Sequence, residues 1–247
     1  MTFYLTILLK EYKINADLGP LMVAYKEAPS KNVRTKVNFH RDIAGSSYSV
    51  IIDLSVQVLE SGKNCALSFS NHKEDQDNIK SLRPWQIKAI EKGFQNSQLS
   101  GPILKYPVLQ GGIKVHRVEF SGGKVPDVIY SAAMSNAFKT LLQEAQTTLL
   151  EPIMKLVINA EVDAESVVIN DLLLKGGEIT DRQETGGYII ISGHAPLREL
   201  RGYSSHIRMI SSGKAFFGME FSHYERMDET SQNEAIKEVT GFAPPTK

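Results

Sequence analysis

The chain has 247 residues and a formal net charge of zero, with 28 lysines and arginines against 28 aspartates and glutamates. Hydrophobic residues make up 42% of the chain and charged residues 23%, which is typical of a globular protein and excludes a disordered one. The charge is unevenly divided: residues 1–149 carry 18 basic and 13 acidic residues, whereas residues 150–247 carry 10 and 15. This asymmetry indicates that one half of the chain meets an anionic partner.

Two classes of protein are excluded by what the sequence lacks. Cys65 is the single cysteine, so the chain can form neither an internal disulfide nor a cysteine-based zinc site. No apolar run approaches the ~20 residues that span a bilayer. The apolar start, residues 1–10, has no basic region before it, no cleavage site and no arginine, so it predicts neither a signal peptide nor a mitochondrial presequence. We therefore expect a reduced, intracellular, soluble protein.

The first half of the chain mixes strands and helices. Alternating apolar residues predict strands, Pro84 is suited to the first turn of a helix, and three- and four-residue spacing predicts a second helix. A short polar run predicts a loop. In chain order, the expected elements are a strand at 49–59, the loop at 70–77, a helix from Pro84, one or two strands over 108–120, and a helix at 130–145.

The second half has a more regular order. A strand is predicted at 153–160, and Asp163 is expected to cap a helix that runs to about Lys175. Strands at 178–182 and 188–192, a helical region at 196–210 and a strand at 215–221 complete the order β-α-β-β-α-β, the split ferredoxin-like arrangement. Both helices are expected on one face of an antiparallel sheet. The residues expected to face inward from the first helix are Val168, Ile169, Leu172 and Leu173.

No catalytic or cofactor motif is present. The sequence contains no phosphate-binding G-x-x-x-x-G-K-[ST] loop, no G-x-S-x-G elbow and no H-E-x-x-H, and its six histidines show no metal-ligand spacing. Some ferredoxin-like domains are phosphatases, but the loop after the first strand, Glu161–Glu165, is acidic here and would repel phosphate. We therefore expect no catalysis, cofactor or metal from this chain alone.

Basic residues provide the better functional signal, because their clusters suit contact with RNA phosphates. A solvated charged face is the alternative interpretation, and Arg208 could instead pair with Glu199 or Glu220. The first cluster, in a stretch without acidic residues, comprises Lys31, Arg34, Lys36 and Arg41. The second, around the second ferredoxin-type helix, comprises Arg198, Arg201, His206, Arg208 and Lys214. No aromatic RNA-reading motif is present, so sequence-specific recognition is not indicated.

Ordered motifs then point to a family. These are Leu149-Leu-Glu-Pro-Ile-Met-Lys155, Val168-Ile-Asn-Asp-Leu172, Pro196-Leu-Arg-Glu-Leu200 and Met219-Glu-Phe221. They resemble the last domain of elongation factor G, a five-domain ribosomal GTPase, in order and spacing. Weaker matches upstream, such as Tyr106-Pro-Val108, extend the resemblance over about residues 9–225.

The resemblance implies an α+β chain with two complete domains. Residues 1–28 would be a remnant of domain III, 29–149 a ribosomal-protein-S5-like domain IV, 150–225 a ferredoxin-like domain V and 226–247 a tail. In the family, domain IV reaches the decoding centre and domain V lies against large-subunit rRNA, so the implied partner is the ribosome, with no membrane and no DNA. GTP and Mg²⁺ would bind a GTPase domain that this chain lacks. The rRNA contacts expected are the two basic clusters and Lys124.

Two loops depart from the translocating members of the family. Residues 43–50 form a shorter loop without the glutamine of those members, and residues 120–127 lack their histidine. In these loops the chain looks more like the mitochondrial ribosome-releasing members, which disassemble ribosomes after termination together with the ribosome-recycling factor. The resemblance therefore implies a mitochondrial location and a recycling role. A fragment of a translocating factor and a free-standing ribosome- or RNA-binding module remain alternatives.

Overall fold

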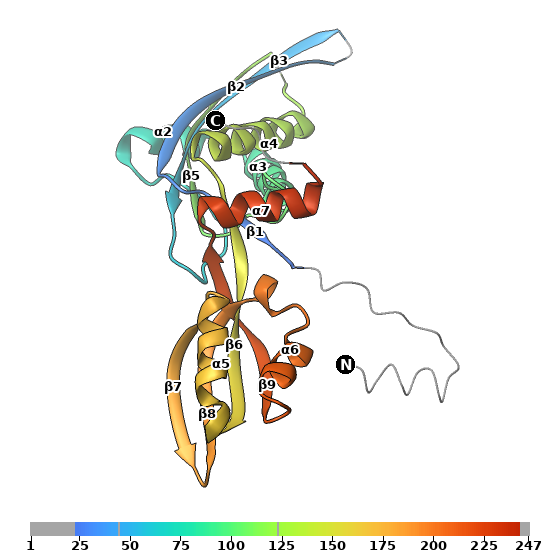
Figure 1. The fold of residues 1–247 in the computed structure, drawn as a ribbon. Helices are drawn as coiled ribbons and strands as arrows, with labels where there is room; N and C mark the ends of the chain where they lie inside the picture. Colours follow the sequence, from blue (N-terminus) through green and yellow to red (C-terminus); the bar gives the residue numbers. More distant parts are fainter. Residues whose placement is uncertain (1–22, 44, 123, 243–247) are drawn as a thin grey trace, which may run out of the picture.

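A computed structural model describes residues 23–43, 45–122 and 124–242, and these form two lobes that β6 connects (Figure 1). Each lobe contains one sheet with helices packed on it, so the fold is α+β, as expected. One sheet has the strand order β2-β3-β5-β4. The other has the order β1-β6-β8-β7, with β9 also paired to β6. We call these the upper and lower lobes, as they lie in Figure 1.

The upper sheet is built around a long hairpin. On β3 the side chains of Val50, Ile52, Leu54 and Val56 alternate inward and are at most 2% exposed. Helices α3 and α4 cover this face, which confirms the two helices predicted from Pro84 and from the apolar spacing. The upper-lobe elements are β2 (Val33–Ile43), β3 (Ser46–Val58), β4 (Ala66–Phe69), α2 (Lys73–Ser81), α3 (Pro84–Ser97), β5 (Gly111–Ser121) and α4 (Asp127–Glu144).

Two expectations for the upper lobe need correction. The polar run at 70–77 predicts a loop, but α2 begins within it. This helix buries no residue and so has no apolar stripe to reveal it. Its one apolar residue is the partly buried Ile79, which packs against the core. Polar groups also connect it to the sheet, because the Asn78 side-chain amide exchanges hydrogen bonds of 2.8 and 3.0 Å with the backbone of Val118. The one or two strands expected over 108–120 are the single strand β5.

The lower lobe has the predicted β-α-β-β-α-β order. Its core joins Val168 and Leu172 of α5 to Tyr203 and Ile207 of α6 in one cluster, so both helices cover the same sheet face. The lower-lobe elements are β6 (Thr148–Glu161), α5 (Glu165–Leu174), β7 (Glu178–Thr185), β8 (Tyr188–Pro196), α6 (Tyr203–Ile210) and β9 (Ala215–Arg226), with 3₁₀ turns η1 (Val162–Ala164) and η2 (Leu197–Leu200).

Three details differ from the sequence prediction in this lobe. Asp163 does not cap the helix: it lies in η1, and the cap position is Ala164, which makes no side-chain hydrogen bond. Leu173 does not face inward, since it is 51% exposed. The helical region at 196–210 is interrupted at Gly202, whose φ of 68° ends η2 and precedes α6.

A third apolar cluster lies where the lobes meet. It joins Tyr25 and Leu149 to Ala235 of α7 (Glu229–Thr240), so the segment expected as a tail contains a packed helix. Strand β1 (Lys26–Ala28) pairs with the first residues of β6 at the same place. Residues 1–22 of the expected domain III remnant, including the apolar start, lie outside the described residues.

Candidate functional site

Two predicted RNA-contact residues lie at the tip of the upper lobe. Arg41 is near the end of the β2–β3 hairpin, opposite Tyr48. Lys124 follows β5, whose last residue pairs with Ser49. The chain after β5 can lie this close to the β2–β3 hairpin because Gly122 has a φ of 107° and no side chain. A Cβ there would be 2.3 Å from the Ser47 carbonyl oxygen. The register therefore brings Arg41 and Lys124 to the same end of the molecule.

The charge at this tip differs from the charge along the hairpin stem. Arg34 forms a bidentate ion pair with Asp53, with N–O distances of 2.9 and 2.7 Å. Lys36 lies 3.5 Å from Glu119. By contrast, Arg41 and Lys124 at the tip are exposed and form no ion pair with a carboxylate of the described residues. Lys31 is also exposed and without such an ion pair, but it precedes β2 at the other end of the stem. The stem is thus neutralised, and the tip presents unpaired cations.

Two arginines of the second predicted cluster form intramolecular ion pairs. Arg198 donates a 3.0 Å bond to Glu151 and a 2.9 Å bond to the Ser231 hydroxyl. Glu151 is only 7% exposed, and burial raises its pKa, although Arg198 acts in the opposite direction. Arg201 pairs with Glu238. Since Ser231 and Glu238 belong to α7, these arginines attach that helix to the lower lobe.

The remaining cations of this cluster also have internal contacts. His206 Nε2 lies 2.7 Å from an Asp171 carboxylate oxygen. Lys214 pairs with Asp163 and Glu161, and its hydrogen bond to Asp163 raises the pKa of the ammonium. The alternative considered for Arg208 is not observed, because neither Glu199 nor Glu220 is its partner.

Arg208 instead lies over the ring of Phe216, with its guanidinium carbon 5.4 Å from the ring centroid. The described residues provide no carboxylate partner for it. It is therefore the one member of the second cluster whose charge is not matched by an acid among residues 124–242.

A serine, a histidine and an aspartate meet on the outer side of the upper sheet, a cluster that sequence reasoning missed. His116 Nε2 is 2.8 Å from the Ser55 hydroxyl, and Nδ1 is 3.2 Å from Asp75. The hydrogen-bonded order Ser55–His116–Asp75 resembles the Ser-His-Asp triad of a hydrolase. However, Ser55 lies in mid-strand, paired with Arg34 on one side and Lys114 on the other, so it is not on an exposed turn beside free backbone donors. We assign the cluster to attachment of α2.

The described residues contain no group of three or more His, Cys, Asp or Glu that could hold a metal ion. None of their helices is long and apolar enough to cross a membrane. Neither Lys124 nor Lys214 belongs to a phosphate-binding loop before a helix. The helix that follows Lys124 has Asp127 in its first turn, and Lys214 leads into a strand. Cys65 is buried, which raises the pKa of its thiol to about 12.

Comparison with known families identifies the lower lobe. Residues 148–235 match the family described as "Elongation factor G C-terminus". Residues 148–235 therefore form a carboxyl-terminal domain of the elongation factor G type. This match agrees with the resemblance seen in the sequence motifs and with the ferredoxin-like order of β6 to β9.

Similarity to whole proteins extends the match across both lobes. The chain is 31% identical to "Ribosome-releasing factor 2, mitochondrial" of Danio rerio over 236 residues, and the match covers 94% of this chain and 30% of that protein. It is 34% identical to the protein of the same name from Drosophila virilis, over 95% of this chain and 33% of that protein. The chain thus spans about a third of the length of these relatives.

A solved structure shows the same fold. The crystal structure of a protein from Thermus thermophilus superposes with a TM-score of 0.77 over 95% of this chain and 34% of that chain, at 21% identity. At that identity the likeness concerns the fold alone. The structural match includes both lobes, because 95% of this chain is covered.

Proposed function

We propose that this chain is the ribosome-contacting, carboxyl-terminal part of a mitochondrial factor that disassembles ribosomes after termination. The observation that carries the proposal is similarity to mitochondrial ribosome-releasing factor 2 over 94–95% of the chain. In this proposal GTP and Mg²⁺ bind a GTPase domain outside the 247 residues. The ribosome-recycling factor is the partner in subunit splitting.

The tip of the upper lobe would enter an RNA-lined region of the ribosome. Support comes from Arg41 and Lys124, which the hairpin register places together with no carboxylate partner among the described residues. Arg208 would supply a phosphate contact from the lower lobe. The paired cations Arg34, Lys36, Arg198, Arg201, His206 and Lys214 would contribute less, because each already faces an acidic side chain.

Sedimentation with mitochondrial ribosomes tests the proposal directly. We expect the 247-residue chain to co-sediment with intact ribosomes in low salt and to be released as salt increases, because phosphate contacts exchange with counterions. Absence of co-sedimentation at about 50 mM KCl would overturn ribosome binding. The GTPase part of the proposal is tested by titration with GTP, where tight binding to this chain would contradict it.

The recycling role needs a second measurement, because a translocating factor would also bind ribosomes. A protein in which this chain replaces the corresponding carboxyl-terminal third of ribosome-releasing factor 2 should split ribosomes when ribosome-recycling factor and GTP are present. Support of polypeptide synthesis without splitting would favour the translocating alternative instead.

A further inference from the structure

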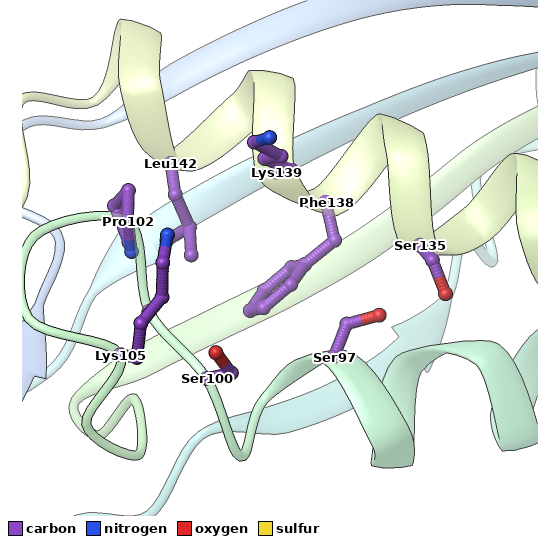
Figure 2. Close-up of a pocket in the computed structure, with 9 residues that line it drawn as sticks. Ser97, Ser100, Pro102, Lys105, Ser135, Phe138, Lys139 and Leu142 are labelled. Carbon is purple, nitrogen blue, oxygen red and sulfur yellow. The ribbon is translucent and has the colours of Figure 1, made fainter.

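A cavity of about 250 Å³ lies in the upper lobe between the end of α3, the loop that follows it and α4. Its apolar lining includes Phe138 and Leu142, both at most 1% exposed. Figure 2 shows the Phe138 ring between Lys105 on one side and Ser97 and Ser135 on the other. The cavity therefore has an apolar centre, a basic end where Lys105 and Ser100 lie, and an end with the Ser97 and Ser135 hydroxyls.

The loop that carries Lys105 is fixed by a buried carboxylate. Glu27 is fully buried, and its two oxygens accept hydrogen bonds from the backbone N–H groups of Ile103, Leu104 and Tyr106, at 2.8–3.1 Å. The loop passes so close that a Cβ at Gly101 would lie 2.3 Å from a Glu27 oxygen. This anchoring gives Lys105 a defined place before any ligand binds.

The basic end suits an anion. Lys105 and Lys139 both line the cavity and are exposed, and its lining contains no carboxylate. Neither lysine forms an ion pair within the described residues. The carboxylate of Glu27 lies beneath the loop and is already satisfied by three backbone donors. Two unpaired ammonium groups with three donors each are appropriate for a phosphate group.

The hydroxyl end has the opposite preference. The Ser97 and Ser135 hydroxyls both donate to the Gly93 carbonyl oxygen, at 2.7 and 3.2 Å. With their protons engaged, these hydroxyls offer only acceptor lone pairs to the cavity. A phosphate oxygen is an acceptor and would gain nothing there, whereas a sugar hydroxyl can donate. The 2′-hydroxyl distinguishes RNA from DNA.

We propose that this cavity holds one nucleotide of an RNA strand, with its phosphate at Lys105 and Lys139 and its 2′-hydroxyl at Ser97 and Ser135. The proposal deepens the proposed function, on which it rests, by naming a further RNA contact in the upper lobe, away from the tip. The cavity would then select RNA by its sugar and would read no base.

Binding of short nucleic acids tests the chemistry. The complete 247-residue chain is titrated with a single-stranded RNA of about 12 nucleotides and with DNA of the same sequence, by fluorescence anisotropy over a range of KCl. Lys105→Gln/Lys139→Gln should reduce the slope of log affinity against log salt for RNA by about 0.7, because the one single-strand phosphate contact that the two lysines share is lost. Lys88→Gln/Lys92→Gln on α3 is the matched control and should leave the slope unchanged. An equal slope in the first variant and the unmodified chain would overturn the proposal.

The serines give a separate prediction. The unmodified chain should bind the RNA several-fold more tightly than the DNA, and Ser97→Ala/Ser135→Ala should remove most of that difference while leaving DNA binding unchanged. Equal affinity of the unmodified chain for RNA and DNA would overturn the sugar contact. Circular dichroism of both variants checks that α3 and α4 remain folded.

Lysine acetylation of the unmodified chain avoids mutation and separates this proposal from the proposed function. RNA and ribosomes should each protect Lys105 and Lys139 from acetylation, relative to Lys88 and Lys92. Ribosome binding with both cavity lysines unprotected would overturn the cavity and leave the proposed function standing. Protection by ribosomes but not by RNA alone would overturn RNA binding in the cavity and would indicate that a ribosomal protein covers it. Protection by RNA without ribosome binding would support the cavity and overturn the proposed function.

Discussion

The two lobes use similar basic residues for different purposes. In the lower lobe, Arg198, Arg201, His206 and Lys214 all face carboxylates of the same chain. At the tip of the upper lobe, neither Arg41 nor Lys124 has such a partner among the described residues. The comparison shows that a cluster of cations in the sequence becomes a candidate RNA contact only where the fold brings no acid to it.

The α7 helix accounts for the part of this difference that concerns Arg198 and Arg201. Ser231 and Glu238 of α7 meet Arg198 and Arg201, and the Gln232 amide oxygen accepts a 2.8 Å hydrogen bond from the backbone of Leu149. The helix therefore connects η2 of the lower lobe to the start of β6. We infer that Arg198 and Arg201 fix the position of α7 at the junction rather than bind a partner.

The largest expected effect is on stability, from Arg198→Ala. This change leaves Glu151 buried without its charge partner, and loss of one partner from a buried pair is strongly destabilising. Because the Arg198 side chain is 23% exposed, we expect a loss of about 2–3 kcal/mol in the free energy of unfolding by urea. Replacing both residues, as Glu151→Leu/Arg198→Met, should recover most of it.

The pH dependence identifies the cause. Burial raises the pKa of Glu151 in the folded state above its unfolded value, so its contribution to stability is fully present below the unfolded pKa and is lost as pH rises through the folded pKa. Removal of Arg198 should raise that folded pKa further. The difference in the free energy of unfolding between the variant and the unmodified protein should therefore be smaller at about pH 5 than at about pH 7. A pH-independent loss would contradict this account, and Arg182→Ala at an exposed pair is the control.

A smaller effect is expected at the tip, and it concerns binding. Arg41→Gln/Lys124→Gln should flatten the salt dependence of ribosome co-sedimentation by about 1.5 in slope, since two phosphate contacts are removed. Stability to urea should not change, because neither side chain has a carboxylate partner among the described residues. An unchanged slope would show that Arg41 and Lys124 do not contact ribosomal phosphates. The proposed difference between the two lobes would then be wrong.

The converse result is expected for Lys214. Its ammonium already pairs with Asp163 and Glu161, so Lys214→Gln should alter the salt slope less than the loss of Arg208 does. Co-sedimentation of Lys214→Gln and Arg208→Gln over the same range of KCl compares them directly. An equal decrease in both variants would show that the ion pair exchanges for rRNA.

Sequence patterns could predict elements but not partners. The β-α-β-β-α-β order was predictable because apolar runs of strand and helix period alternate there. The α2 helix was not, because it buries no residue. The bonds from Glu27 to a loop 76–79 residues away, and from Arg198 to Glu151, 47 residues away, depend on tertiary packing that carries no local signal. This is why the basic residues could be found from sequence while their use could not.

The smallest expected effect concerns α2, which contrasts with the apolar packing of α5 and α6. The Ser70 hydroxyl, followed by His116, lowers the pKa of Asp75. A lowered folded pKa gives stability that is present above the unfolded pKa and is lost as pH falls through the folded value. Hydrogen exchange of the α2 amides should therefore accelerate in the unmodified protein as pH falls below about 4, beyond the intrinsic pH effect on exchange. Asp75→Asn should weaken α2 at neutral pH and reduce this acid dependence, whereas Asp77→Asn, on the exposed side of the same helix, should preserve it. If both variants behave alike, the link from Asp75 to the sheet does not hold α2, and its attachment depends on Asn78 and Ile79.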